Sequence, residues 1–83
     1  MSRLRVFIRC RDPNALITSV SRIVKEIEKA FPGSRAFLRS SYGRTTLVIE
    51  VPTLDERSVT TICSMVRDML KLPVRCRKRR VTT

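Results

Sequence analysis

The stretch from Arg3 to Arg11 constrains the fold most, because every second residue along it is apolar and the positions between them are arginines and one phenylalanine. Its apolar positions are Leu4, Val6, Ile8 and Cys10. Since successive side chains of a strand point to opposite faces, this pattern predicts a half-buried strand. One face belongs to a core, whereas the other carries four arginines around Phe7. A row of like charges repels itself, so this strand favours a polyanionic partner.

A helix is predicted next, because apolar residues then recur at the spacing of a helical face. These residues are Leu16, Val20, Ile23, Val24, Ile27 and Phe31. Asp12 is a good N-cap, and proline is tolerated at the first helical position, which Pro13 occupies. Pro32-Gly33 ends the helix.

The second half of the chain predicts a hairpin, a second helix and a short last strand. The hairpin strands are 35–42 and 45–51, joined at Tyr42-Gly43-Arg44, where glycine supplies a positive φ. Thr53 or Asp55 caps the second helix, whose apolar stripe is Val59, Ile62, Cys63, Val66, Met69 and Leu70. After Pro73, a short strand is expected to give way to a flexible basic tail.

The order is therefore β-α-β-β-α, with a final β. We predict an α+β fold in which two helices cover one face of an antiparallel sheet, the ferredoxin-like or split βαβ arrangement. Residues 1–74 would form the single domain, and residues 75–83 its basic C-terminal end.

Charge and composition bear on partners and location. The 83 residues carry a net charge of +11, which indicates a polyanion such as nucleic acid. The formal charges of the helices and their caps sum to −1, so the strands and the last segment hold all the excess positive charge. No apolar run is long enough to span a bilayer, and no signal peptide is visible, so we expect a cytoplasmic protein without a membrane partner.

The three cysteines of the chain are expected to be reduced, because their spacing indicates no disulfide framework.

The sharpest motif is Arg-x-Phe-x-Arg, which occurs at Arg5 to Arg9 and again at Arg35 to Arg39. One interpretation is a platform on which guanidinium groups meet phosphates and the rings contact bases or sugars. The other is that Phe7 and Phe37 pack on each other or on a second subunit. The RNA-binding candidates are Arg3, Arg5, Arg9, Arg35, Arg39, Arg44, Arg75, Arg77, Lys78, Arg79 and Arg80. The candidates for a partner or dimer interface are Phe7, Phe37, Val48, Met65 and Met69.

Nothing in the sequence predicts catalysis. There is no histidine, no recognisable pair of nucleophile and base, and no glycine-rich phosphate loop among the two glycines. We therefore expect no enzyme activity, no cofactor and no metal site.

The stretch from Thr45 to Leu72 resembles the small dimer-forming (Pcc-type) subunit of the archaeal and eukaryotic KEOPS complex, which makes threonylcarbamoyladenosine in tRNA. The resemblance rests on the strand Thr45 to Val51, on Asp55 in the turn, and on the helix positions Val59, Cys63 and Val66. It implies a homodimer, or a heterodimer with a paralogue, with a continuous sheet. It also implies a helical surface that contacts the catalytic subunit, and a contribution to tRNA binding.

Three hypotheses remain open. The first is a non-catalytic, dimeric accessory subunit of that tRNA-modification complex. The second is a ribosomal or other ribonucleoprotein component of ferredoxin-like fold, which would bind structured RNA and be monomeric alone. The third is an adaptor whose charge serves acidic proteins or lipids.

Overall fold

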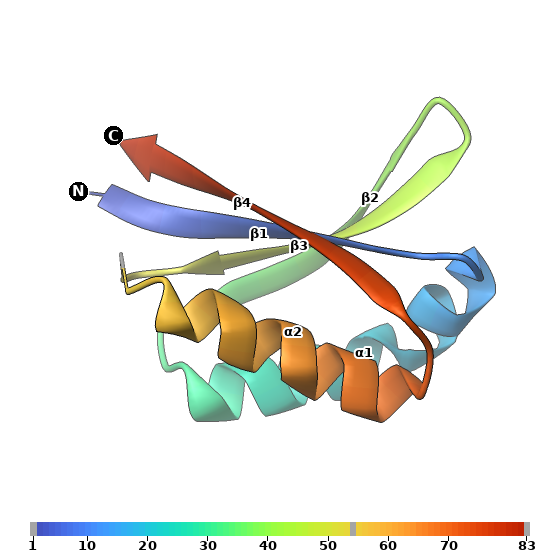
Figure 1. Ribbon diagram of the computed structural model, residues 1–83, viewed down its shortest axis with the longest axis horizontal. Coiled ribbons are helices and arrows are strands. Elements are labelled where there is room, and N and C mark those ends of the chain that lie inside the picture. The colour runs from blue at the N-terminus through green and yellow to red at the C-terminus, as the bar shows by residue number, and fades with distance from the viewer. Residues whose placement is uncertain (1, 54, 83) are drawn as a thin grey trace.

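The chain forms one antiparallel sheet with two helices. The computed structural model describes residues 2–53 and 55–82. Its elements follow the order β1 (Ser2–Cys10), α1 (Pro13–Ala30), β2 (Arg35–Ser41), β3 (Arg44–Val51), α2 (Arg57–Leu70) and β4 (Val74–Thr82) (Figure 1). The strands lie in the order β2-β3-β1-β4, and every neighbouring pair is antiparallel. The predicted α+β, ferredoxin-like fold is confirmed.

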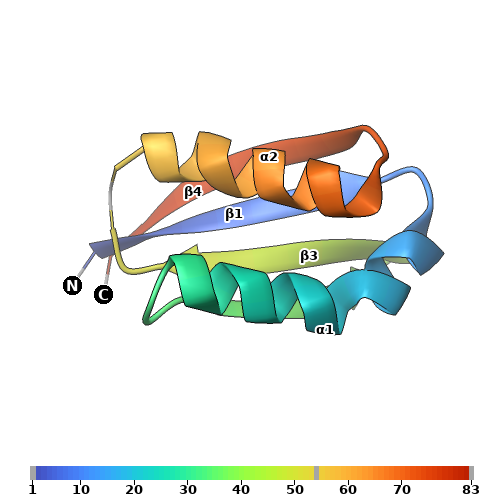
Figure 2. The ribbon, with the colours of Figure 1, turned by 90° about the horizontal axis from the view of Figure 1, so that it is seen from below.

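Both helices lie on the same face of the sheet, so the other face is left open (Figure 2). Leu4, Val6 and Ile8 of β1 point toward the helices and are at most 2% exposed, as the alternation predicted. Their core partners on the other elements are Leu16, Ile23, Ile27, Leu47, Ile49, Val51, Ile62 and Val66. Burial of these apolar side chains on one face supplies the main driving force for folding. No helix in the described parts of the chain has the length and apolar character needed to cross a membrane.

The N-terminus of α1 is capped as the sequence predicted. The Asp12 carboxylate accepts a hydrogen bond from the Asn14 backbone N–H at 3.0 Å, and Pro13 stands at the start of the helix. This bond satisfies one of the N–H groups that lack a partner within the helix.

Replacing Asp12 with alanine should therefore lower the free energy of unfolding by about 1 kcal/mol. Urea denaturation followed by circular dichroism measures the change. Asp68→Ala removes the same charge from the last turns of α2, where an acidic group opposes the helix dipole, and should not destabilise the protein. Equal losses in the two variants would contradict the capping role of Asp12.

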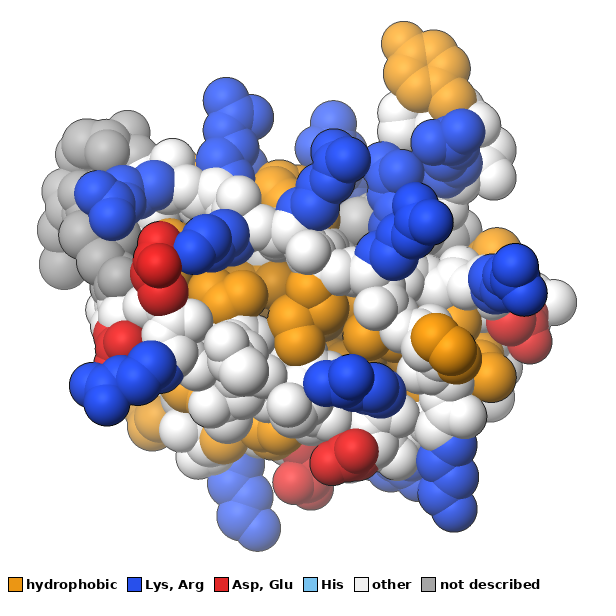
Figure 3. Space-filling view, viewed as in Figure 1, with side chains coloured by type: hydrophobic (Ala, Val, Ile, Leu, Met, Phe, Trp, Pro, Cys, Tyr) orange, Lys and Arg blue, Asp and Glu red, His pale blue; other side chains and the backbone are white. Residues whose placement is uncertain are grey.

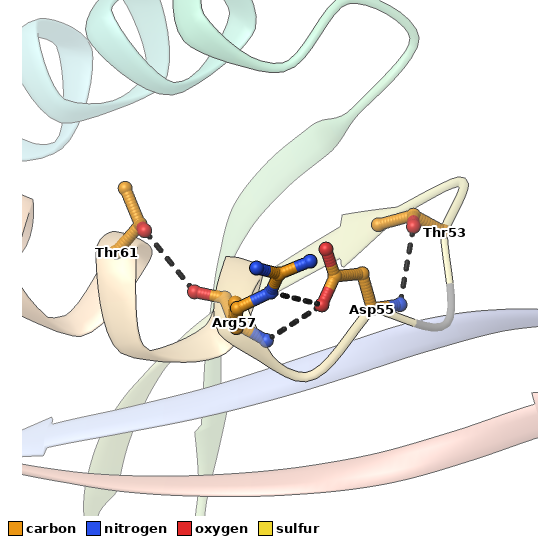
Figure 4. A network of polar contacts seen from close by, with 4 residues as sticks. All are labelled: Thr53, Asp55, Arg57 and Thr61. Atoms are coloured by element: carbon orange, nitrogen blue, oxygen red, sulfur yellow. Dashed lines mark hydrogen bonds and ion pairs between the residues drawn. The ribbon is translucent and has the colours of Figure 1, made fainter.

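The start of α2 is held by a short chain of hydrogen bonds (Figure 4). Thr53 accepts from the Asp55 backbone N–H at 3.1 Å, and Asp55 in turn accepts from the Arg57 backbone N–H at 3.0 Å. This bond to the Arg57 N–H lowers the pKa of the Asp55 carboxyl from its usual value. The predicted cap is corrected, because the N-cap position is Glu56, whose side chain makes no capping bond. Asp55, one residue earlier, bonds instead to the first N–H of the helix.

The prediction of a flexible basic tail is wrong. β4 runs from Val74 to Thr82 and pairs with β1 along its whole length, from Cys10 opposite Val74 to Ser2 opposite Thr82. The backbone of β1 would otherwise present an unpaired edge, and β4 satisfies its free N–H and C=O groups. These backbone bonds order the basic segment, which side-chain charge alone does not predict.

The expectation of three reduced thiols is also corrected. Cys63 on α2 and Cys76 on β4 form a disulfide bond, and only Cys10 is free among the cysteines. The pairing arises because Cys76 lies opposite Ile8, on the face of the sheet that α2 covers. The disulfide joins β4 to the helical layer.

Candidate nucleic-acid interface

The open face of the sheet contains a basic groove. It has a volume of about 730 Å³ and lies between the tip of the β2–β3 hairpin and strand β4, with β1 and β3 as its floor. Its lining residues are Phe7, Arg9, Arg39, Ser41, Tyr42, Arg44, Thr46, Arg75, Arg77, Lys78 and Arg79. Six of these are arginines, and none of the described residues that line the groove is acidic. Figure 3 shows Lys and Arg side chains projecting in a row from the strand side of the molecule.

Two pairs of arginines face each other across β1 and β4. Arg5 lies directly opposite Arg79, and Arg9 lies directly opposite Arg75. Residues that are directly opposite in an antiparallel pair point to the same side of the sheet, and like charges in this position destabilise it. The guanidinium groups therefore oppose folding at these positions. A bound polyanion would remove that repulsion.

Glu50 compensates the charge at the other end of the open face. Its carboxylate is 3.3 Å from the Arg3 guanidinium and 3.5 Å from that of Arg5, and its side chain is 8% exposed. Two predicted RNA-binding residues are thus occupied in ion pairs within the protein. The uncompensated charge lies toward the hairpin, where Arg9 and Arg75 stand beside Arg39 and Arg44.

The two phenylalanines do not form an exposed pair. Phe37 and Phe7 lie on either side of Val48 in the sheet, because each of them is opposite Val48 in its own strand pair. Val48 is only 1% exposed, although it belongs to the open face. Phe37 remains 39% exposed and Phe7 is half-buried. Val48 is therefore unavailable as an interface residue, and the two rings form an apolar centre around it.

The register separates the basic residues of β4 onto two faces. Arg75, Arg77 and Arg79 share the open face with Phe7, whereas Lys78 and Arg80 lie opposite core residues of β1. Lys78 is a lining residue of the groove, but its ammonium pairs with the Glu56 carboxylate at 2.7 Å, beside the start of α2. This hydrogen bond and the charge of Lys78 lower the pKa of Glu56. The residues of the predicted basic run are therefore divided between the two faces of the sheet, and Arg80 does not line the groove.

Met65 and Met69 belong to a different surface from the phenylalanines. Both are on α2 and pack, half-buried, against the core. The Arg22 guanidinium of α1 donates a hydrogen bond to the Met69 carbonyl oxygen at 3.0 Å, so Met69 lies where the helices meet. The five predicted interface residues are thus not brought together into one patch.

Tyr42 is a groove residue that the sequence interpretation treated only as part of a turn. It stands at the tip of the β2–β3 hairpin, and its side chain is fully exposed. A signal for it exists in the sequence, because an aromatic residue before glycine is unusual in a two-residue hairpin turn.

The described residues do not assemble a metal-binding cluster. Within the described ranges, no three His, Cys, Asp or Glu side chains lie close enough together to hold a metal ion. The groove itself offers guanidinium, hydroxyl and aromatic groups, which bind anions and rings.

Comparison with known proteins places the fold. No family model matches the sequence, and no curated protein matches it. The de novo designed protein Foldit4 has a TM-score of 0.65 with 17% sequence identity, and the match covers 99% of this chain and 97% of that one. The solution NMR structure of the de novo designed protein LFR1 1, described as having a ferredoxin fold, has a TM-score of 0.54 with 19% identity over 99% of this chain and 85% of that one. At these identities the likeness shows the fold alone, which is a ferredoxin fold.

Proposed function

We propose that the protein binds RNA through the open face of its sheet and acts as a non-catalytic accessory subunit. The observation that carries this proposal is the placement of Arg9 opposite Arg75 in a groove that six arginines line. This pair of like charges destabilises the free protein. A ligand with closely spaced negative charges is stabilised by the same arrangement, and the phosphate backbone of a nucleic acid has that spacing.

Contacts to phosphate and sugar should dominate the interaction. A guanidinium group bonds phosphate oxygens in a bidentate geometry, and six arginines line the groove. Phe7 and Phe37 are partly covered and surround Val48, so they offer little surface for reading base identity. Recognition by shape and backbone therefore agrees better with this face than recognition of a sequence.

For the biological setting we propose the tRNA-threonylcarbamoyladenosine complex of the cytoplasm, following the resemblance of residues 45–72 to its dimer-forming subunit. The near-neutral helical layer would face the catalytic subunit, with Met65 and Met69 at the contact. The open face would then remain accessible to tRNA. A second copy, or a paralogue, would join through a sheet edge or through the region of Phe7 and Phe37.

The salt dependence of tRNA binding tests the electrostatic part of the proposal. If each of the six groove arginines neutralises one phosphate, the slope of log affinity against log salt should be about −4 on single strands and about −5 on duplexes. Fluorescence anisotropy with labelled tRNA at several salt concentrations gives this slope. A slope near zero would overturn the proposal, because binding would then not displace counterions.

Light scattering on a size-exclusion column tests the assembly. The accessory-subunit proposal expects a dimer that binds tRNA reversibly with salt. A monomer that binds only large structured RNA would instead favour a ribosomal or other ribonucleoprotein component.

A further inference from the structure

Tyr42 occupies a position that its side chain does not favour. Ser41 and Arg44 are paired at the end of the β2–β3 ladder, so the turn between them consists of Tyr42 and Gly43 alone. Both residues have positive φ, at 52° for Tyr42 and 72° for Gly43. This is the pattern of a type I′ turn, in which asparagine, aspartate or glycine is preferred at the first position.

The tyrosine ring also receives no packing from the protein. It is 100% exposed, which is the highest exposure among the described large apolar and aromatic side chains. Neither the backbone conformation nor burial therefore accounts for an aromatic residue here. Strained backbone positions cluster at ligand-binding sites, where a ligand supplies the missing contacts.

Tyr42 lies at the edge of the basic groove. Tyr42 lines it together with its neighbours Ser41 and Arg44, and Arg75 lies on the β4 side. An aromatic face beside a row of cations is the combination that binds single-stranded nucleic acid, since bases stack on the ring while phosphates meet the cations. The interior of a duplex cannot use the ring in this way, because its base faces are already stacked on each other.

We infer that the groove takes an unpaired segment of RNA and that Tyr42 stacks on one of its bases. This inference rests on the proposed function and makes it more specific. The RNA would lie between the hairpin tip and β4, with its phosphates on Arg44 and Arg75. Single-stranded regions, such as loops and ends of a structured RNA, would therefore be the bound parts.

The chain provides its own probe of this stacking. Tyr42 is its one tyrosine and there is no tryptophan, so intrinsic tyrosine fluorescence reports on this ring alone. A short single-stranded RNA should quench the fluorescence on binding. Inorganic polyphosphate, which has charge but no bases, should bind without this quenching. A long duplex, which exposes base faces only at its two ends, should behave like polyphosphate.

The variant Tyr42→Asn separates stacking from folding. Asparagine suits the positive φ of the turn, so the protein should become more stable, whereas affinity for the single strand should fall by about 5- to 150-fold. Tyr42→Phe keeps the ring and should keep the affinity, and Ser21→Ala, at an exposed position of α1 outside the groove, serves as the control. Affinity for the duplex should be the same in all three variants as in the wild type.

The outcomes distinguish the two proposals. If the wild type binds single strand and duplex with equal affinity and Tyr42→Asn changes neither, the stacking inference is wrong while RNA binding by the open face stands. If neither RNA binds with a salt-dependent affinity, the proposed function itself is wrong. Loss of single-strand binding in Tyr42→Asn together with retention in Tyr42→Phe supports both.

Discussion

Replacing Arg75 and Arg77 with glutamate should weaken RNA binding by at least about 100-fold while the domain remains folded. Both arginines lie on the open face of β4 and line the groove. A hydrogen bond to a charged group contributes about 1.5–3 kcal/mol, so two lost phosphate contacts together exceed a factor of 100 in affinity. Reversal of the charge adds repulsion of the phosphates to this loss. Fluorescence anisotropy at one fixed salt concentration measures the effect.

The same variant should not lose stability. Arg75 lies opposite Arg9, so glutamate at this position replaces a pair of like charges with a pair of opposite charges. Cross-strand pairs of opposite charge contribute about 0.2–1 kcal/mol, and the free energy of unfolding should rise accordingly. Weaker binding with greater stability would identify Arg75 as a residue kept for its ligand rather than for the fold.

The matched control is Lys25→Glu with Lys29→Glu, which changes the net charge by the same amount on exposed positions of α1. The control should retain most of the affinity, because α1 lies on the far side of the sheet from the groove (Figure 2). An equal loss in the two double variants would show that only overall charge attracts RNA, and the assignment of the groove would fail.

Reduction of the Cys63–Cys76 disulfide should lower the free energy of unfolding by about 3 kcal/mol. The two cysteines are 13 residues apart in the sequence, and closure of a loop of this size removes conformational entropy from the unfolded chain. For a domain of this length the melting temperature should fall by about 10–25 °C. Thermal unfolding followed by circular dichroism, with and without a thiol reductant, measures the difference.

The Cys76→Ser variant should unfold at the lower melting temperature both with and without the reductant. The Cys10→Ser variant should show the same fall in melting temperature on addition of the reductant as the wild type. A wild-type protein whose melting temperature does not respond would contradict the disulfide. The disulfide also matters for the groove, because it anchors β4, which contributes Arg75, Arg77 and Arg79 to the lining of the groove. Cytosolic thiols are normally kept reduced. In such a compartment β4 would be held by its pairing with β1 and by packing alone.

The fold could be predicted because each element has a local cause. The alternation in β1 and the apolar stripes of the helices follow from the two periods of backbone structure. The Asp12 cap and the glycine at the hairpin turn are equally local. Once two helices and an antiparallel sheet were expected, burial of every apolar stripe left few arrangements, and the ferredoxin-like one was found.

The candidate site could be predicted only in part, because it depends on which residues lie opposite each other. The arginine pairs at Arg5–Arg79 and Arg9–Arg75 join segments about 70 residues apart in the sequence. Their register is set by the burial of the β1 core face, since a shift of one residue would turn every side chain over. The same register places Lys78 beside Glu56, on the face of the sheet opposite the open face.

The sequence by itself determined the elements, the apolar faces and the excess of positive charge on the strands, because these depend on residue type and period. Only the tertiary structure decided that the last segment is an ordered strand, that Val48 is covered, and that Cys63 meets Cys76. It also placed Tyr42 at the edge of the groove. Each of these depends on the pairing of distant segments, in which backbone hydrogen bonds and burial outweigh the local preferences of the chain.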